Sequence, residues 1–286
     1  MLRDLLRKWK LSDDRRSIHF TDGFKAGRFK LLGTRDLHFY PMESINRVRI
    51  VRRSDGYYAQ FVVHVERREE REPTHKTIGL DVGLHHFYTD SEGHQVENPR
   101  PLRKSERRLK QAQRRASKKV KGSKNRRKAI NRLGRAHLKV QRQRRDFAVK
   151  QARCVVKSND FVALEDLQIR NMVKNHHLAK SISDAAWGEF RRWVEYFGKV
   201  FGVATVAVPP QYTSQNCSNC GAVVKKTLST RTHCCPRCGH IQDRDHNAAS
   251  NILRIGLSTV GHTGINAWGE TDRYLDQATG LDKLIR

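Results

Sequence analysis

Alternating hydrophobic and polar positions mark the first quarter of the chain as strand-rich. The runs SIHF, GRFKLLG, INRVRIVRR and YYAQFVVHVERR carry β-branched and aromatic residues, and Asp55–Gly56 supplies a turn between the last two. A short basic helix is expected before them, in MLRDLLRKWK. Residues 1–75 are therefore predicted to form a small antiparallel sheet or barrel.

The next pattern alternates short apolar runs with helical periodicity. The segment HKTIGLDVGLHHFYTDSEGHQVEN predicts a strand, a glycine-containing turn and a hairpin that turns at Ser91–Gly93. NDFVALEDL and VATVAVPP predict two further buried strands. Between them a helix capped by Ser183 is expected, and its apolar face comprises Trp187, Phe190, Val194, Phe197 and Phe201. DHNAASNILRIGL predicts a last amphipathic helix before a loose tail.

Residues 101–146 differ from both neighbours, because they hold 20 Lys and Arg against two acidic residues. An apolar stripe recurs at helical intervals in this segment, at Ile130, Leu133, Val140 and Phe147. KVKGSKN interrupts the pattern, which favours two long helices joined as a hairpin. A disordered basic tail is the alternative, and the stripe argues against it.

The charge of the whole chain indicates its partner. The 286 residues include 57 Lys and Arg against 29 Asp and Glu, a formal net charge of +28 that favours a polyanion. A membrane surface is the other candidate, but no apolar run approaches the ~20 residues of a spanning helix, and no apolar signal segment follows the charged start. We therefore expect a nucleic-acid-binding protein inside the cell, cytoplasmic and associated with the nucleoid.

Four of the six cysteines form two C-x2-C pairs, each followed by glycine, in CSNCG and CPRCG. This spacing predicts a zinc site in a reducing compartment, and four thiolates leave no open coordination position, so its role is structural. Cys234 adjoins the second pair, but only Cys235 has the two-residue spacing to Cys238. The predicted zinc ligands are Cys217, Cys220, Cys235 and Cys238.

Three acidic residues lie at the ends of predicted elements. Asp81 closes a strand in TIGLDVGL, Glu165 closes another in FVALEDL, and Asp245 begins the last helix in DRDHNAA. If the two strands are parallel neighbours, Asp81 and Glu165 project at one end of the sheet. Three converging carboxylates repel one another unless a cation binds them, which predicts a two-metal site holding Mg²⁺ or Mn²⁺.

Each acid also has a plainer interpretation when it is taken alone. Asp81 is then a turn residue, Glu165 an exposed strand end and Asp245 a helix cap. Taken together with the excess of Lys and Arg, the three favour catalysis on nucleic acid. Asp243 is expected to be a neighbour of the site rather than a ligand. The order Asp, Glu, Asp is that of a nuclease, whereas a transposase of the Asp-Asp-Glu type places Glu last.

These motifs together resemble the TnpB proteins of insertion sequences, compact relatives of type V CRISPR effectors. The resemblance rests on IGLDVGL, FVALEDL, PPQYTSQNCSNCG, CCPRCG and DRDHNAASNIL, and runs from about residue 35 to 256. It implies an α/β RNase H-like (RuvC) nuclease domain with an inserted zinc ribbon, preceded by a partial β-barrel (wedge) domain. It also implies a guide RNA from the transposon end and metal-dependent cleavage of double-stranded target DNA, with Asp81, Glu165 and Asp245 as the catalytic acids.

The resemblance also implies domain boundaries. We expect a partial wedge at 1–75, RuvC segments at 76–100, 149–212 and 241–257, a basic helical hairpin at 101–148, a zinc ribbon at 213–240 and a flexible tail at 258–286. The hairpin is expected to bind the guide–target duplex through Arg107, Arg108, Arg114, Arg115, Lys118, Lys119, Arg126 and Arg127.

The chain departs from the family pattern at its amino terminus. Family members carry about a hundred further residues there, so this chain is expected to begin partway through the wedge. The leading hypothesis is an RNA-guided DNA endonuclease. A non-cleaving RNA-guided regulator, or a truncated accessory protein of an insertion sequence, is the second. A purely structural zinc-ribbon nucleic-acid binder is the third, and it leaves Asp81 and Glu165 unexplained.

Overall fold

The structure is a computed structural model that describes residues 8–262, apart from residues 22, 24–25, 34–35 and 228. The chain divides into two compact units. One comprises residues 1–67 and 115–135, and the other comprises residues 68–114 and 136–286. The tip of the predicted basic hairpin therefore groups with the amino-terminal residues.

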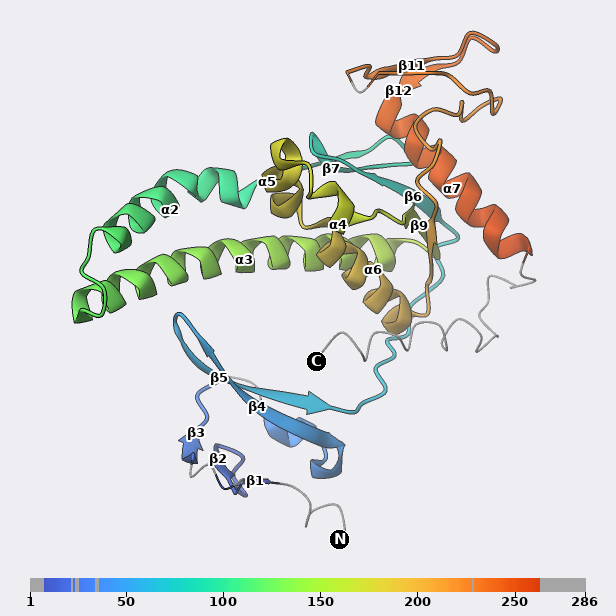
Figure 1. The fold of residues 1–286 in the computed structure, drawn as a ribbon. Helices are drawn as coiled ribbons and strands as arrows, with labels where there is room; N and C mark the ends of the chain where they lie inside the picture. The colour runs from blue at the N-terminus through green and yellow to red at the C-terminus, as the bar shows by residue number, and fades with distance from the viewer. Residues whose placement is uncertain (1–7, 22, 24–25, 34–35, 228, 263–286) are drawn as a thin grey trace. The chain divides into compact units, whose positions relative to one another are not determined.

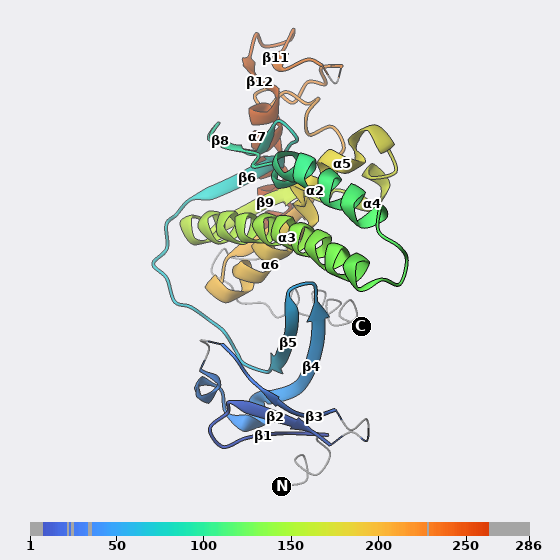
Figure 2. The ribbon, with the colours of Figure 1, turned by 90° about the vertical axis from the view of Figure 1, so that its left-hand side faces the viewer.

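The first unit contains two antiparallel β-structures (Figure 2). The three-stranded sheet consists of β1 (Trp9–Leu11), β2 (Ser17–Phe20) and β3 (Gly27–Lys30). β4 (Ile45–Arg53) and β5 (Gly56–Val63) form a hairpin that turns at Ser54–Asp55, and short 3-10 helices lie at Leu37–Phe39 and Met42–Ser44. The expected strands are confirmed, but residues 9–11 form a strand and not the predicted helix, because Trp9 pairs with Phe20 and is buried. Residues 1–7 lie outside the described part.

The second unit is built on a five-stranded sheet in the order β10-β9-β6-β7-β8 (Figure 1). β6 (Thr77–Val82), β9 (Phe161–Glu165) and β10 (Ala204–Val208) are parallel, whereas β7 (His86–Asp90) and β8 (Gln95–Glu97) continue the sheet as an antiparallel hairpin. The predicted strands and the turn at Ser91–Gly93 are confirmed. β10 is an edge strand with Ala204 and Ala207 exposed, so the expectation that it is fully buried is wrong.

Helices cover both faces of this sheet (Figure 1). Ile78 and Leu80 of β6, with Val162 and Leu164 of β9, pack on one side against α6 (Trp187–Phe201) and the carboxyl-terminal half of α3 (Lys124–Ser158). Phe161 and Ala163 pack on the opposite side against α7 (Arg244–His262). Successive strand residues point to opposite faces, so this alternation fixes the face of each residue that follows.

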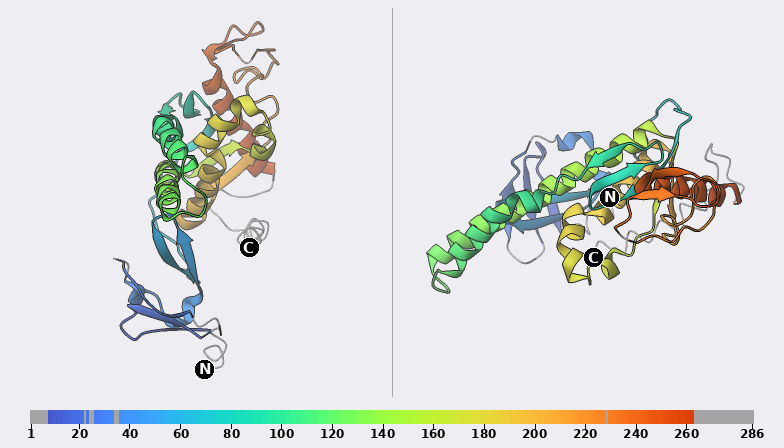
Figure 3. Two further views of the ribbon diagram at one scale, coloured as in Figure 1. Left: turned by 60° about the vertical axis from the view of Figure 1, so that its left-hand side comes forward. Right: turned by 90° about the horizontal axis from the view of Figure 1, so that it is seen from above.

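Two long helices form a hairpin (Figure 3). α2 (Pro101–Ser117) and α3 are joined at residues 118–123, as predicted. The buried carboxylate of Asp184, in α5 (His176–Ala185), accepts hydrogen bonds from the backbone N–H of Leu102 and Arg103 and pairs with Arg144 at 2.8 Å. One carboxylate therefore caps the start of α2 and holds α3 beside it.

Two helix predictions need correction. Ser183 lies inside α5 and caps nothing, because Asn175 caps that helix and the left-handed backbone of Ala186 (φ 59°) separates it from α6. The apolar face predicted for α6 is buried as expected. Ile130 is 48% exposed, so the stripe along α3 becomes buried only from Val140 onward.

The remaining elements are α4 (Ile169–Met172), β11 (Thr232–Cys234) and β12 (Ile241–Asp243).

α7 lies against the sheet at two places where only glycine fits. A Cβ added at Gly79 of β6 would lie 2.3 Å from the carbonyl oxygen of Ala249 and 2.7 Å from the backbone nitrogen of Leu253. A Cβ added at Gly256 would lie 2.7 Å from the Cβ of Ala163 on β9. The helix continues to His262, beyond the predicted end at 257, while residues 263–286 of the expected tail lie outside the described residues. These contacts fix where α7 begins relative to the strand ends.

Candidate active site and metal centre

The ends of β6 and β9 place two of the predicted acids at the same level of the sheet. Leu80 pairs with Leu164 in the parallel register, so Asp81 and Glu165 are the next residues on adjacent strands. Gly79 and Ala163, two residues earlier on the same strands, contact α7. Side chains on a strand alternate between faces with a period of two, so residues 81 and 165 face the same side. Asp81 and Glu165 therefore lie side by side on the α7 face, at the carboxyl ends of the strands, as predicted.

The first turn of α7 brings Asp245 to the same level. Asp245 precedes Ala249, the residue against Gly79, by one helical turn, which is a rise of about 6 Å. Asp81 lies two strand residues beyond Gly79, about 7 Å further along β6. The electrostatic influence of both Asp245 and Glu165 on Asp81 agrees with this placement. The structure thus brings together residues 81, 165 and 245, here called the acid trio.

Asp243 has a different task from the trio. Its Oδ1 accepts hydrogen bonds from the backbone N–H of Asp245 at 2.9 Å and of His246 at 3.1 Å. Asp243 is therefore the N-cap of α7, which leaves the carboxylate of Asp245 available for another role. His246 packs against the β7–β8 turn, with its Nε2 3.2 Å from the carbonyl oxygen of Ser91.

The environment of Asp81 and Glu165 disfavours negative charge. Burial raises the pKa of Asp81 well above its ordinary value, and the neighbouring Glu165 and Asp245 raise it further, while Arg244 opposes them. Burial also raises the pKa of Glu165, against a hydrogen bond from Thr213 that lowers it. A bound divalent cation reverses this preference because it favours the ionised carboxylates. Carboxylate oxygens are the ligand type that Mg²⁺ and Mn²⁺ prefer.

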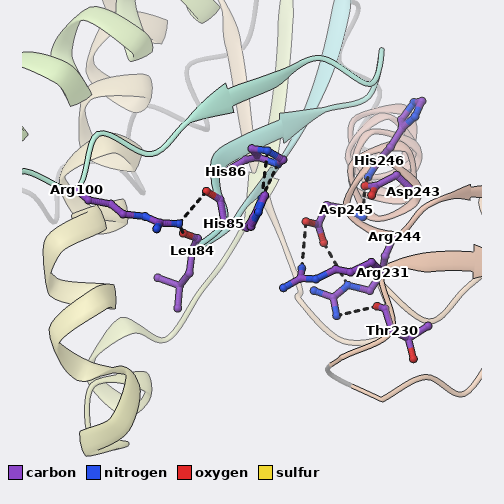
Figure 4. Close-up of polar contacts among 10 residues, drawn as sticks. All are labelled: Leu84, His85, His86, Arg100, Thr230, Arg231, Asp243, Arg244, Asp245 and His246. Carbon is purple, nitrogen blue, oxygen red and sulfur yellow. Dashed lines mark hydrogen bonds and ion pairs between the residues drawn. The ribbon is translucent and has the colours of Figure 1, made fainter. Parts of the chain in front are cut away.

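Arginines lie against Asp245 in this structure (Figure 4). Oδ1 of Asp245 lies 3.2 Å from Nε of Arg244, and Oδ2 lies 3.6 Å from Nη1 of Arg231. Among the described residues, no group of metal-ligand atoms that all lie within 4.8 Å of one another includes the trio. The carboxylates are thus neighbours whose oxygens are more widely spaced than the sulfur atoms of the four cysteines described next.

The four predicted cysteines form one compact cluster. Their sulfur atoms all lie within 4.8 Å of one another, with Cys217 Sγ 3.7 Å from Cys238 Sγ and Cys220 Sγ 3.6 Å from Cys235 Sγ. A tetrahedral zinc ion with ~2.3 Å bonds to sulfur separates its ligands by about 3.8 Å, so the cluster fits that ion. Cys234 is exposed at the end of β11 and does not belong to the cluster.

Asn247 of α7 joins the cysteine segment to that helix. The amide nitrogen of Asn247 donates to the carbonyl oxygen of Asn216 at 2.8 Å, and its Oδ1 accepts from the backbone N–H of Ser218 at 2.9 Å. Ser218 directly follows Cys217. The helix that carries Asp245 and the first cysteine pair are therefore held together by a buried amide.

Known protein families match both regions that carry these residues. Residues 60–176 match the family described as "Probable transposase", and residues 187–252 match "Cas12f1-like, TNB domain". A Streptomyces pristinaespiralis protein named "Putative RNA-guided DNA endonuclease" is 41% identical over 187 residues, and the match covers 65% of this chain and 46% of that protein. Escherichia coli K12 "Putative RNA-guided DNA endonuclease InsQ" is 31% identical over 76% of this chain and 58% of its own length.

Over these two regions the chain is similar to TnpB-type proteins. The mimivirus "TnpB-like protein L79" is 27% identical over 70% of this chain and 41% of its own length. The chain spans about half the length of the curated relatives that it matches. A solved complex, "Cryo-EM structure of the Cas12f1-sgRNA-target DNA complex", covers 72% of this chain and 55% of its own chain, with 17% identity and a TM-score of 0.47.

The basic residues predicted to contact nucleic acid lie on α2, at its end and at the start of α3. All eight are exposed except Arg126, which is half-buried. Burial of Leu109 and Ala116 on the other side of α2 leaves most of these cations directed to solvent. No helix in the described part of this chain is both long and apolar enough to cross a membrane.

Sequence reasoning missed the residues that surround the acids. Thr213 donates a hydrogen bond to Glu165, Asn251 binds the backbone of Thr213, and Arg231 and Arg244 face Asp245. Arg244 lies between the two aspartates of DRD and is visible in the sequence as their neighbour. The contacts of Thr213 and Arg231 join residues far apart in the chain and have no local sequence signal.

Proposed function

We propose that this chain carries the nuclease centre of a transposon-associated, RNA-guided DNA endonuclease. The observation that carries the proposal is the convergence of Asp81, Glu165 and Asp245 on one face of the sheet, at the carboxyl ends of the strands. In open α/β sheets this is where ligands bind. The names of the relatives from Streptomyces and Escherichia coli support the same activity.

The proposed fold is an RNase H-like (RuvC) domain with an inserted zinc ribbon. It is supported by the strand order β10-β9-β6-β7-β8, in which the antiparallel hairpin continues a parallel core. Helix α7 follows the four-cysteine segment directly, as expected if a structural zinc site fixes the start of that helix. The two β-structures of residues 9–63 are proposed to be part of a wedge domain.

The acid trio would hold two ions, Mg²⁺ or Mn²⁺. When bound, such ions supply an activated water and stabilise the leaving oxygen of a phosphodiester. The chain's own residues prepare for this. β6 and β9 fix Asp81 and Glu165 in register, and α7 sets Asp245 beside them. Arg231 and Arg244, which face Asp245, would attract the phosphate backbone.

Nucleic-acid binding is proposed for the exposed cations of α2 and the start of α3. Lys and Arg side chains that contact phosphates recognise a guide–target duplex by shape, while base pairing reads its sequence. The relatives from Streptomyces and Escherichia coli are named as RNA-guided enzymes that act on DNA, which supports RNA and DNA as the two partners of this chain.

A cleavage assay tests the proposal. The full chain is purified with its co-expressed RNA and incubated with Mg²⁺ and matched double-stranded DNA, and the bound RNA is sequenced to define the target. We expect wild type to cut and Asp81→Ala, Glu165→Gln and Asp245→Asn to bind the DNA without cutting it. Binding without cutting by wild type would instead identify a non-cleaving regulator and refute the nuclease.

A further inference from the structure

We propose that Thr213 is a positioning residue of the acid site, whose hydroxyl fixes the rotamer in which Glu165 binds a metal ion. The inference rests on the proposed function and deepens it. Thr213 lies in the loop between β10 and the first cysteine pair, and it is buried with 3% of its surface exposed. Its hydroxyl oxygen lies 2.5 Å from Oε1 of Glu165 and 3.1 Å from the carbonyl oxygen of Pro210.

The hydroxyl group of Thr213 can donate only one hydrogen bond at a time. A threonine has a single O–H proton, which can be donated either to Glu165 or to Pro210. An ionised carboxylate is the stronger acceptor, and the contact with Glu165 is also the shorter of the two. The bond to Oε1 of Glu165 is therefore favoured over the bond to the carbonyl oxygen of Pro210.

The backbone of Thr213 is itself held by the helix that carries Asp245. The amide nitrogen of Asn251 donates to the carbonyl oxygen of Thr213 at 2.9 Å and to that of Asn216 at 2.7 Å. Asn251 is buried, and its bond to Thr213 forms away from solvent. A continuous chain of hydrogen bonds thus runs from α7 through Thr213 to Glu165 on β9.

This chain of contacts sets the spacing of two acids that come from different elements. Asp245 is fixed by the first turn of α7, and Glu165 by its strand and by Thr213. Groups that orient metal ligands raise affinity because the ligand no longer has to be ordered when the ion binds. Thr213 accordingly contributes to metal affinity without touching the ion or the DNA.

Manganese binding measures this directly. Mn²⁺ is titrated into the full chain, purified free of RNA, and the unbound ion is followed by electron paramagnetic resonance. Asp81→Ala defines the binding that does not involve the trio. Thr213→Val, which removes the hydroxyl at nearly constant shape, should weaken Mn²⁺ binding by about 10–100-fold. Thr213→Ser, which keeps the hydroxyl, should bind close to wild type.

Thr205→Val is the matched control. Thr205 lies on β10 three residues before Val208, the residue that pairs with Glu165, so the same substitution is made on the neighbouring strand away from the acids. Wild-type Mn²⁺ affinity in Thr213→Val would overturn the inference, as would a Thr213→Ser variant that binds as weakly as Thr213→Val. If Asp81→Ala binds Mn²⁺ like wild type, the metal site of the proposed function fails as well. If Asp81→Ala weakens Mn²⁺ binding and Thr213→Val does not, the role of Thr213 is refuted while the metal site stands.

Discussion

The contact between α7 and Gly79 makes a sharp prediction about Gly79→Ala. The added methyl carbon would lie 2.3 Å from the carbonyl oxygen of Ala249, whereas ordinary contact begins at 3.4 Å. Because the opposing atoms belong to the helix backbone, they cannot rotate away as a flexible side chain would. The helix must therefore withdraw from the sheet by about 1 Å, and overpacking of this kind costs about 1–3 kcal/mol of folding free energy.

The same displacement moves Asp245 away from Asp81 and Glu165. A misplacement of about 1 Å in a catalytic constellation can cost about 100-fold in rate, so the DNA cleavage proposed for this chain should fall by that factor. Urea unfolding and single-turnover cleavage measure the two effects on the same sample.

Gly188→Ala is the matched control, because the nearest atom to its added methyl is 3.9 Å away, on the side chain of Ile169. In helix α6 that change should be neutral or stabilising by up to about 1 kcal/mol. If Gly79→Ala has the stability and cleavage rate of wild type, the contact between α7 and Gly79 does not determine the position of Asp245.

Three further predictions concern stability. Asp243→Ala should lower the unfolding free energy by about 1 kcal/mol because α7 loses its cap, whereas Asp243→Ser should retain most of it in urea unfolding; equal losses would contradict the capping role. Burial opposes the ionisation of Asp160, but hydrogen bonds from Thr74, Arg71 and the backbone N–H of residue 75 outweigh it and lower its pKa to about 2. Its stabilisation, about 1–2 kcal/mol, should therefore be complete above pH ~4 and disappear as pH falls toward 2. A pH series of thermal unfolding would show the gap between wild type and Asp160→Asn closing with acid, and a constant gap would be the contrary result. Chelation of zinc, or Cys217→Ser, should lower the melting temperature, while Cys234→Ser should leave it unchanged; a melting temperature indifferent to chelator would exclude a structural metal.

Much of the site is local in the sequence. Strand-ending acids and the C-x2-C spacing each lie within a few residues, so Asp81, Glu165 and the four cysteines could be predicted together with their elements. In the parallel register of β6 and β9, Leu80 pairs with Leu164, so the acids that end the two apolar runs lie next to each other. The metal-binding role of the trio stays a prediction.

What could not be predicted depends on contacts between distant residues. Ile130 continues the apolar stripe of α3 but remains 48% exposed, because periodicity shows which face is apolar and not how far a partner extends along it. Serine is a common N-cap residue, but Ser183 lies inside α5, whose N-cap is Asn175. The hydrogen bond from Thr213 to Glu165 spans 48 residues of sequence and has no periodic signal.

The order in which the chain is synthesised gives the placement of Asp245 on α7 a further consequence. Asp81 and Glu165 are made first, and Asp245 emerges 80 residues after Glu165. At translation rates of about 5–20 residues per second, that interval is roughly 4–16 s. A nascent chain can form its parallel strands during this time without a complete acid site. If the trio is the catalytic centre, the enzyme stays inactive until α7, the last helix described, has docked on Gly79.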